Sequence, residues 1–358
     1  MATNTSLVYR YHGGRKRNIK YDFSVNVNPL GPPKIVYEVI KKNLDLIRYY
    51  PEETSWTLKK IYAKKWKLKP ENIIIGNGAS ELIFLYINML SPDRIIVPIP
   101  SFSEYYIASS LKERELIMPM YIEKGADFLP SIENILAAIS PFSLLIIGNP
   151  NNPTGTLYQK EELLEIIKHA KEKDAHVFID ESFIDFVDKR CDIYEFINMY
   201  PNLFILKSFT KIFSIPGIRF GIGIGSEKII EQLEERRDPW SVNIFAQHLG
   251  RYLIREDKFI EETKKFIHKE REFIYKHLST NSQLKIYNTY ANFYLLKFLK
   301  ISSKEAIDFL LKNDIYVRDA SNFIGLSDKF IRVAIKTRRE NKLFLRYIKS
   351  FIENLHFS

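Results

Sequence analysis

The sequence predicts an α/β protein, with a large domain around a mostly parallel central sheet and a smaller α+β domain. Short apolar segments alternate with amphipathic helical segments between residues 72 and 225, which is typical of parallel strands joined by helices. The strand-like segments are apolar through most of their length, as expected for strands covered on both faces. Polar motifs directly follow several of them, where α/β folds bind ligands.

Six segments have the composition of buried strands: NIIIGNG (72–78), RIIVPIP (94–100), LLIIGNP (144–150), HVFIDES (176–182), LFILKSF (203–209) and RFGIGIG (219–225). Helical patterns lie between several of them. In KEELLEIIKHAKEKD (160–174) the apolar residues follow the helical period.

The chain changes character after residue 226. Long, charged, amphipathic helical segments follow, interrupted by the strand-like LKIYNTYANFYLLKFL (284–299) and DKFIRVAIK (328–336). The first 44 residues contain no strand–helix unit of their own. We therefore predict a large domain over 45–226 and a small domain made of 1–44 and 227–358.

Composition limits the class of protein. With 46% hydrophobic and 27% charged residues, the chain has the balance of a soluble globular protein, and its apolar runs are too short to cross a membrane. The single cysteine, Cys191, excludes a disulfide framework and a CxxC metal pair. The first thirty residues have no apolar core of a secretory signal. We expect a cytoplasmic protein without a membrane partner.

The net charge of +10 admits nucleic acid as a partner. However, basic and acidic residues are interspersed, as in KFIEETKKFIHKERE (258–272), which is typical of solvated helix faces. No nucleic-acid-binding motif is visible. We expect no nucleic-acid partner, and the charge suits an enzyme of small phosphorylated substrates equally well.

Two turn motifs are candidates for ligand binding. GNGASELI (76–83) follows a strand and opens a helix, so backbone N–H groups near Ala79 and Ser80 would face an anion; the alternative is an ordinary turn capped by Ser80. NPNNPTG (149–155) also follows a strand and presents Asn152. The alternative there is a simple Pro/Asn/Gly turn.

Two charged residues follow later strands. Asp180 ends an apolar strand in FIDES, where a carboxylate needs a cationic partner or becomes protonated; the alternative is a helix N-cap. Lys211 lies in SFTKIFSIPGIRFG (208–221), eight positions before Arg219. The alternative for Lys211 is an ordinary surface lysine.

The ordered set of glycine turn, Asn152, Asp180, Lys211 and Arg219 resembles the fold-type I enzymes of pyridoxal 5′-phosphate, and in particular the branch of the histidinol-phosphate aminotransferases. The resemblance extends over nearly the whole chain. It implies that Lys211 forms the Schiff base with the cofactor aldehyde, that Asp180 pairs with the pyridinium nitrogen and that Asn152 hydrogen-bonds the phenolic oxygen.

The resemblance implies further cofactor contacts. Tyr105 corresponds to the aromatic residue that stacks on the cofactor ring, with Phe102 as the alternative, and Tyr50 corresponds to a tyrosine that reaches the cofactor phosphate of the neighbouring subunit. A homodimer with shared active sites follows. The residues implied at the glycine turn and the cofactor phosphate are Gly78, Ala79, Ser80, Ser208 and Arg219.

The pattern departs from the aminotransferases at Phe183, where that branch usually carries a tyrosine. The segments YHGGRKRNIKYDFSVNVNPLGPP (11–33), VRDASNFIGL (317–326) and FIRVAIKTRRENKLF (330–344) resemble instead the threonine-phosphate decarboxylases, enzymes of the cobalamin nucleotide-loop pathway. The cations of RKRN after His12-Gly13-Gly14 are a departure from this family as well.

This resemblance implies decarboxylation of O-phospho-L-threonine or O-phospho-L-serine. The substrate-binding residues that it implies are His12, Gly13, Asn28, Asn152, Arg318 and Arg332. If the arginines bind the phosphate, for which their planar fork is suited, the α-carboxylate loses its usual anchor and can stand perpendicular to the cofactor ring. The alternatives are histidinol-phosphate aminotransferase, which uses 2-oxoglutarate, and a non-catalytic small-molecule-binding protein of the same fold.

Overall fold

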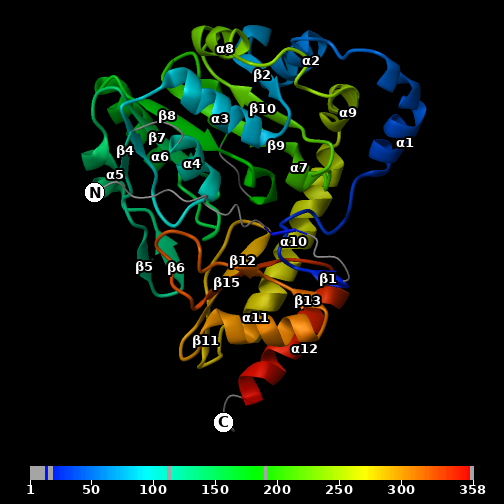
Figure 1. Ribbon diagram of the computed structural model, residues 1–358, viewed down its shortest axis with the longest axis vertical. Coiled ribbons are helices and arrows are strands. Elements are labelled where there is room, and N and C mark those ends of the chain that lie inside the picture. Colours follow the sequence, from blue (N-terminus) through cyan, green and yellow to red (C-terminus); the bar gives the residue numbers. More distant parts are fainter. Residues whose placement is uncertain (1–12, 15–18, 111–113, 189–191, 355–358) are drawn as a thin grey trace.

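The computed structural model describes residues 13–14, 19–110, 114–188 and 192–354. Within this part of the chain, seven strands form the main sheet in the order β2-β10-β9-β8-β7-β3-β4 (Figure 1). Their bounds are β2 Ile73–Gly76, β3 Arg94–Ile96, β4 Glu115–Ile117, β7 Ser143–Gly148, β8 His176–Asp180, β9 Leu203–Ser208 and β10 Gly221–Ile224. The six strand-like segments of the sequence are all strands of this sheet.

The main sheet is mostly parallel. The pairs β9–β8, β8–β7, β7–β3 and β3–β4 are parallel, whereas β10 is antiparallel to both β2 and β9. Therefore β2 runs in the same direction as β9, and the carboxyl ends of β2, β7, β8 and β9 share one edge of the sheet with the start of β10. This arrangement brings together motifs that are far apart in the sequence.

Helices cover both faces of the main sheet. Because successive side chains of a strand point to opposite faces, Ile73 and Ile75 belong to the same buried cluster as residues of α2, α5 and α6, whereas Ile74 belongs to the cluster that contains residues of α3, α4 and α8. These helices are α2 Trp56–Trp66, α3 Ala79–Leu90, α4 Ser103–Ser109, α5 Ile132–Ala138, α6 Lys160–Glu172 and α8 Glu227–Glu234. Burial on both faces accounts for the continuous apolar runs in the sequence.

A second sheet, of four strands in the described residues, has the order β11-β12-β15-β14 and lies at the opposite end of the molecule from α2 and α8 (Figure 1). Its strands are β11 Leu284–Ile286, β12 Phe293–Phe298, β14 Arg318–Asp319 and β15 Phe330–Ala334. The long helix α10 (Asp257–Leu278), α11 (Ser303–Lys312) and α12 (Arg338–Asn354) pack beside it. The short strand β1 (Tyr21–Asp22) pairs in parallel with β13 (Ile315–Tyr316), so the N-terminal segment joins this part of the molecule.

Several contacts cross the domain boundary that we predicted, and the boundary itself stays a prediction. We predicted that the small domain begins at residue 227, but α8 packs on β2 and α3, and α9 (Ile244–Leu253) packs on α2 and on α1 (Lys34–Lys42). Conversely, the hairpin of β5 (Ile122–Lys124) and β6 (Asp127–Leu129) reaches the second sheet, where Glu123 binds Lys297 at 3.1 Å. The amphipathic pattern of a helix shows that one face is buried, but not against which sheet.

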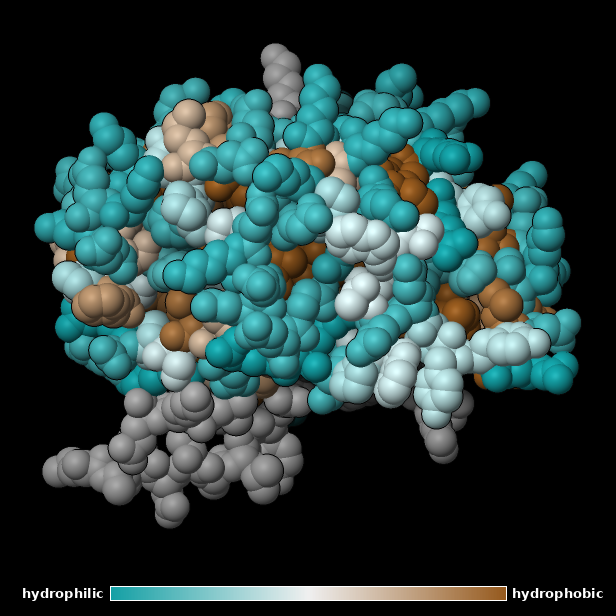
Figure 2. Space-filling model, turned by 90° about the horizontal axis from the view of Figure 1, so that it is seen from above, coloured by the Kyte–Doolittle hydropathy of each residue, from teal (hydrophilic) through white to brown (hydrophobic). Residues whose placement is uncertain are grey.

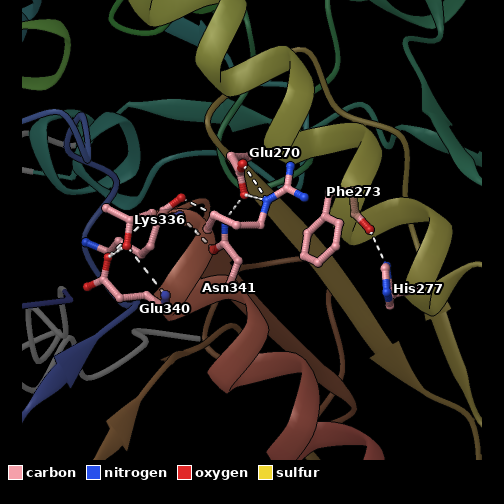
Figure 3. A network of polar contacts seen from close by, with 8 residues as sticks. Glu270, Phe273, His277, Lys336, Glu340 and Asn341 are labelled. Carbon is pink, nitrogen blue, oxygen red and sulfur yellow. Dashed lines mark hydrogen bonds and ion pairs between the residues drawn. The ribbon is translucent and has the colours of Figure 1, made fainter.

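The start of α12 is fixed to α10 by a buried carboxylate (Figure 3). Glu270 accepts hydrogen bonds from Arg338 Nε at 2.8 Å and from Asn341 Nδ2 at 2.8 Å. Asn341 Oδ1 in turn accepts from the backbone N–H of Lys336 at 2.9 Å. Since β15 ends at Ala334, this network holds the corner that follows β15, the strand that carries Arg332.

The surface seen from the end that carries α2 and α8 is mainly hydrophilic, with hydrophobic side chains in separate small areas (Figure 2). None of the helices in the described part of the chain has both the length and the apolar composition needed to cross a membrane.

Candidate active site

Two adjoining cavities lie at the shared edge of the main sheet. The larger, of about 640 Å³, is lined on its polar side by Ser24, Asn26, Arg219, Arg318 and Arg332, among other residues. The smaller, of about 70 Å³, contains Ala79, Tyr105 and Asp180. The residues that line both are Ser80, Phe102, Asn152, Phe183 and Lys211. We call them the outer and the inner cavity.

Lys211 lies between the two cavities on α7 (Phe209–Ile212), directly after β9. Burial lowers the pKa of Lys211 to about 8; the Asp180 carboxylate opposes this shift, and the nearby cations Arg219 and Arg332 add to it. Its Nζ lies 3.5 Å from Ser208 Oγ, and 6.0 Å from the centre of the Phe183 ring. Lys211 is therefore a half-buried residue whose amine is partly neutral near pH 7, as a nucleophilic lysine must be.

Asp180, at the end of β8, provides the carboxylate of the inner cavity. Its Oδ1 accepts from the backbone N–H of Ser182 at 2.8 Å, and its Oδ2 accepts from the Tyr105 hydroxyl at 2.8 Å. Burial and the Asp180 carboxylate raise the pKa of Tyr105, so the phenol stays protonated and donates. This carboxylate is held in one orientation by two neutral donors.

A glycine turn joins β2 to α3. Gly78 has a φ of +84°, and a Cβ atom there would lie 2.4 Å from Arg219 Nη2, so only glycine permits this arrangement. Arg219 itself has a φ of +59°, which is strained for a large side chain. A Cβ at Gly221 would lie 2.8 Å from the N–H of Ala79. The start of α3 and the Arg219 guanidinium therefore lie together at one corner of the site.

Arg332, on β15, is surrounded by neutral acceptors. Its Nη2 donates to the Ser24 carbonyl at 2.9 Å and its Nη1 donates to Asn152 Oδ1. With its amide oxygen turned toward the guanidinium, Asn26 accepts from Nε at 3.2 Å. Among the described residues, no carboxylate forms an ion pair with Arg332. The cation is positioned without being neutralised.

A second arginine reinforces this positive charge. Arg318 donates to Asn322 Oδ1 at 2.8 Å and lies 5.1 Å above the Phe323 ring, while Arg332 lies 5.4 Å from the Phe293 ring. Burial and the nearby Arg318 lower the pKa of Arg332 to about 9, which leaves it protonated at neutral pH. Two buried guanidinium groups at one cavity favour an anion with more than one charge.

Some of the residues predicted from the sequence have other contacts. We predicted that the Tyr105 ring stacks on the cofactor ring. Tyr105 lines the inner cavity and its hydroxyl donates to Asp180, whereas Phe102 lines both cavities. Asn28, predicted to bind substrate, lines neither cavity; its amide donates to the Ile212 carbonyl and to Thr263 Oγ1, both at 2.8 Å.

Three other predictions have different outcomes. Gly13 lines the outer cavity, whereas His12 is outside the described residues. Tyr50 is 81% exposed and contacts neither cavity of its own chain. A contact of Tyr50 with a second subunit stays a prediction.

Ser24 and Asn26 line the outer cavity but were not among the residues predicted from the sequence. The segment DFSVNVNP contains two asparagines in alternation, and in an extended segment alternate residues share a face. Both asparagines were therefore candidates, and the pattern alone does not distinguish the one that faces Arg332.

The donor set fits pyridoxal phosphate. The inner cavity offers a carboxylate for a ring nitrogen in Asp180 and an amine for an aldehyde in Lys211, and the corner with Gly78 and Arg219 offers a cradle for a phosphate. In the described part of the chain, no group of three or more histidine, cysteine, aspartate or glutamate side chains could hold a metal ion.

Comparison with known proteins agrees with this site. The model of the family "Aminotransferase class I and II" matches residues 18–348, and the chain belongs to this family. A relative from Caldanaerobacter subterraneus subsp. tengcongensis, provisionally named a threonine-phosphate decarboxylase, is 38% identical over 92% of this chain and 89% of its own length.

Two solved structures are also similar. The histidinol-phosphate aminotransferase of Clostridium acetobutylicum has a TM-score of 0.87 and 35% identity, and covers 94% of this chain and 100% of its own. The L-threonine-O-3-phosphate decarboxylase of Porphyromonas gingivalis has a TM-score of 0.84 and 25% identity, with 93% and 100% covered. The predicted fold class, the resemblance to these two groups of enzymes and the pyridoxal-phosphate cofactor are confirmed. The comparisons include both decarboxylases and aminotransferases, so the choice of reaction depends on the site.

Proposed function

We propose that this protein decarboxylates an O-phospho-L-amino acid, O-phospho-L-threonine or O-phospho-L-serine, and releases the phosphorylated amino alcohol. The observation that carries the proposal is the pair Arg332 and Arg318 at the outer cavity, buried and adjacent to Lys211. A phosphate with nearly two negative charges is the ligand that such a pair favours. We propose that this product is used to build the cobalamin nucleotide loop, because the sequence resembles the threonine-phosphate decarboxylases of that pathway.

Pyridoxal phosphate, when bound, supplies an electron sink for the pair left by the broken Cα–carboxylate bond. We assign Lys211 to its aldehyde, Asp180 to its ring nitrogen and Asn152 to its phenolic oxygen. The cofactor phosphate is assigned to the corner of Ala79, Ser80, Ser208 and Arg219, next to Gly78. We assign the ring face to Tyr105, whose hydroxyl donates to Asp180, with Phe102 as the alternative, since both residues line the inner cavity.

The residues of the outer cavity explain the choice of bond. If Arg332 and Arg318 bind the distal phosphate, with Asn26 and the Gly13 backbone beside them, Arg332 does not hold the α-carboxylate, which is then free to leave as carbon dioxide. We assign the return of a proton to Cα to Lys211, whose pKa is about 8 before the cofactor is bound. Substrate positioning, rather than an added catalytic group, selects decarboxylation.

We further propose that the active form is a homodimer in which Tyr50 contacts the partner's cofactor phosphate. Several large apolar side chains of the N-terminal segment are exposed in the single chain, including Tyr37, Leu44, Ile47 and Tyr49. Such a group of exposed side chains supports an interface with a second copy. The single cysteine supports a cytoplasmic location.

A second candidate is histidinol-phosphate aminotransferase, which the similarity to the Clostridium acetobutylicum enzyme supports. In that case Arg332 would bind the α-carboxylate. Phe183 argues against it, because the aminotransferases of this branch usually carry a tyrosine at this position. The Phe183 ring packs edge-on against Phe293 at 5.2 Å, beside Lys211, and offers no hydroxyl to the site.

The test is a direct comparison of substrates. The protein loaded with pyridoxal phosphate is incubated with O-phospho-L-threonine, with O-phospho-L-serine, and with histidinol phosphate plus 2-oxoglutarate, while carbon dioxide and glutamate are measured. We expect carbon dioxide from at least one phosphorylated amino acid and no glutamate. Formation of glutamate from histidinol phosphate, without carbon dioxide from either amino acid, would establish the aminotransferase instead.

A further inference from the structure

Ser24 contacts two different parts of the outer cavity. Its backbone carbonyl accepts from Arg332 Nη2 at 2.9 Å, and its side-chain Oγ accepts from the backbone N–H of Gly14 at 3.0 Å. Ser24 is completely buried and lines the cavity together with Gly13. One residue therefore links the principal cation of the cavity to the backbone segment that forms the neighbouring wall.

Asp22 fixes the direction of these hydrogen bonds. Its Oδ1 accepts from the Ser24 hydroxyl at 2.6 Å and from the Ser24 backbone N–H at 2.8 Å. Because the only hydroxyl hydrogen of Ser24 is given to Asp22, the Oγ lone pairs face the other side, where Gly14 donates. A serine in this position acts as an acceptor for Gly14 and not as a donor.

The approach of the two segments is too close for a side chain at position 13. A Cβ at Gly13 would lie 2.3 Å from the Ser24 carbonyl oxygen and 3.0 Å from Ser24 Oγ. A Cβ atom cannot fit at that distance, so any larger residue would displace the backbone carbonyl that orients Arg332. The contact between Gly13 and Ser24 and the orientation of Arg332 are thus parts of one arrangement.

We propose that Ser24 is a positioning residue, which aligns the Gly13–Gly14 backbone with the Arg332 guanidinium so that both face the substrate phosphate at once. This inference rests on the proposed function. Ser24 does not touch the reacting atoms. It acts on the affinity for the phosphorylated substrate, through the fixed spacing of the two groups that surround the phosphate.

The test compares Ser24→Ala with a matched control, Ser143→Ala. Ser143 is also completely buried. Its Oγ also donates to one oxygen, the Ser140 carbonyl at 2.7 Å, and accepts from one backbone N–H, that of Ser140 at 3.2 Å. It begins β7 and so lies at the opposite edge of the sheet from the cavities. Both variants lose a buried hydroxyl that donates one hydrogen bond and accepts one, but only Ser24→Ala loses it at the outer cavity.

We expect Ser24→Ala to raise KM for O-phospho-L-threonine about three- to tenfold, the value of one hydrogen bond, with kcat changed less than about twofold. Ser143→Ala should leave KM unchanged, and it should lower the thermal midpoint about as much as Ser24→Ala does. Gly13→Ala, which displaces the Ser24 carbonyl itself, should raise KM further. The slow reaction of unphosphorylated L-threonine should have the same KM in Ser24→Ala and in the wild type.

Equal KM values for Ser24→Ala, Ser143→Ala and the wild type would overturn the proposal, as would an equal rise of KM for L-threonine. A wild type that releases no carbon dioxide would contradict the proposed function and not this inference. In that case the same ratios are measured as dissociation constants of O-phospho-L-threonine, by calorimetry on the cofactor-loaded protein.

Discussion

Lys211, Asp180 and Arg332 are ionisable side chains that line the two cavities, and each of them has neighbours of a different kind. Asp180 accepts two hydrogen bonds from neutral donors, and Arg332 donates to neutral acceptors. Lys211 has cations nearby and its pKa falls. In each case the charge is oriented but left available, which is expected where a cofactor or substrate provides the opposite charge.

The pKa of Lys211 gives the first prediction. Only the neutral amine attacks an aldehyde, and a pKa of about 8 makes roughly a tenth of Lys211 neutral at pH 7 and most of it at pH 9. The rate at which cofactor-free protein gains visible absorbance from added pyridoxal phosphate should therefore rise about tenfold between these pH values and level off above them. Borohydride should then fix the cofactor covalently on Lys211.

The control for this measurement is Lys211→Ala, which should gain no such absorbance. A rate that continues to rise up to pH 10.5 would contradict the low pKa. A wild-type protein that gains no absorbance at any pH would contradict the assignment of the cofactor to Lys211.

At the scale of the elements, the direction of the strands assembles the site. Asp180, Ser208 and the glycine turn end strands that run the same way, and Arg219 precedes the antiparallel strand β10 at the same edge. Arg332 comes from β15 of the second sheet. The site therefore depends on a fixed position of the second sheet relative to the first.

The Glu270 network carries a prediction about stability. Glu270→Ala should lower the thermal midpoint of the cofactor-loaded protein clearly, with a loss of about 2 kcal/mol, because Arg338 and Asn341 lose a buried acceptor. Glu272→Ala on the same helix is the control, since its side chain is 71% exposed and its loss should be close to zero. Equal shifts of the midpoint in the two variants would show that Glu270 has no special role.

Much of the fold could be predicted from the sequence, because strands buried on both faces have continuous apolar runs and the polar residues at their ends interrupt them. Asp180 and Lys211 could be found in this way. The hydrogen bond from Tyr105 to Asp180 could not, because the sequence does not show which side chain of another strand the Tyr105 hydroxyl faces.

The contacts between distant segments were the least predictable. Asn26 and Asn28 have the same residue type, and only the pairing of β1 with β13 and the path of the chain past Arg332 distinguish them. Likewise, the burial of α8 and α9 could be predicted from their patterns, whereas their partners in the main sheet are a property of the tertiary structure.

At the scale of the whole molecule, the Tyr50 side chain is exposed and lines neither cavity of its own chain. Its ring lies 5.0 Å from that of Trp240, and both are well exposed. The segment that follows Tyr50 is held by hydrogen bonds to its backbone. Gln247 binds the N–H and carbonyl of Glu52, and Arg237 donates to the Glu53 carbonyl at 2.6 Å. An exposed but well-anchored aromatic pair is suited to contact a second subunit.

Complementation tests the shared site. Tyr50→Phe should retain the cofactor poorly and Lys211→Ala should be inactive, but a heterodimer of the two has one site with both residues intact. An equal mixture, after subunit exchange, should recover roughly a quarter of the wild-type activity, because half of the dimers are mixed and each has one complete site. A mixture no more active than the mean of its components, or a fully active monomer in sedimentation, would refute the shared site.

The central claim is that Arg332 binds the substrate phosphate and not the α-carboxylate. The most direct measurement is kcat/KM of Arg332→Ala with O-phospho-L-threonine and with L-threonine, with the cofactor absorbance as a check of folding. Loss of a buried charge-assisted contact costs about 2–5 kcal/mol, or roughly a 30- to several-thousand-fold drop, and we predict this drop for the phosphorylated substrate and a much smaller one for L-threonine. An equal drop for both substrates, with amino transfer in place of carbon dioxide release, would contradict the account and identify Arg332 as the anchor of the carboxylate.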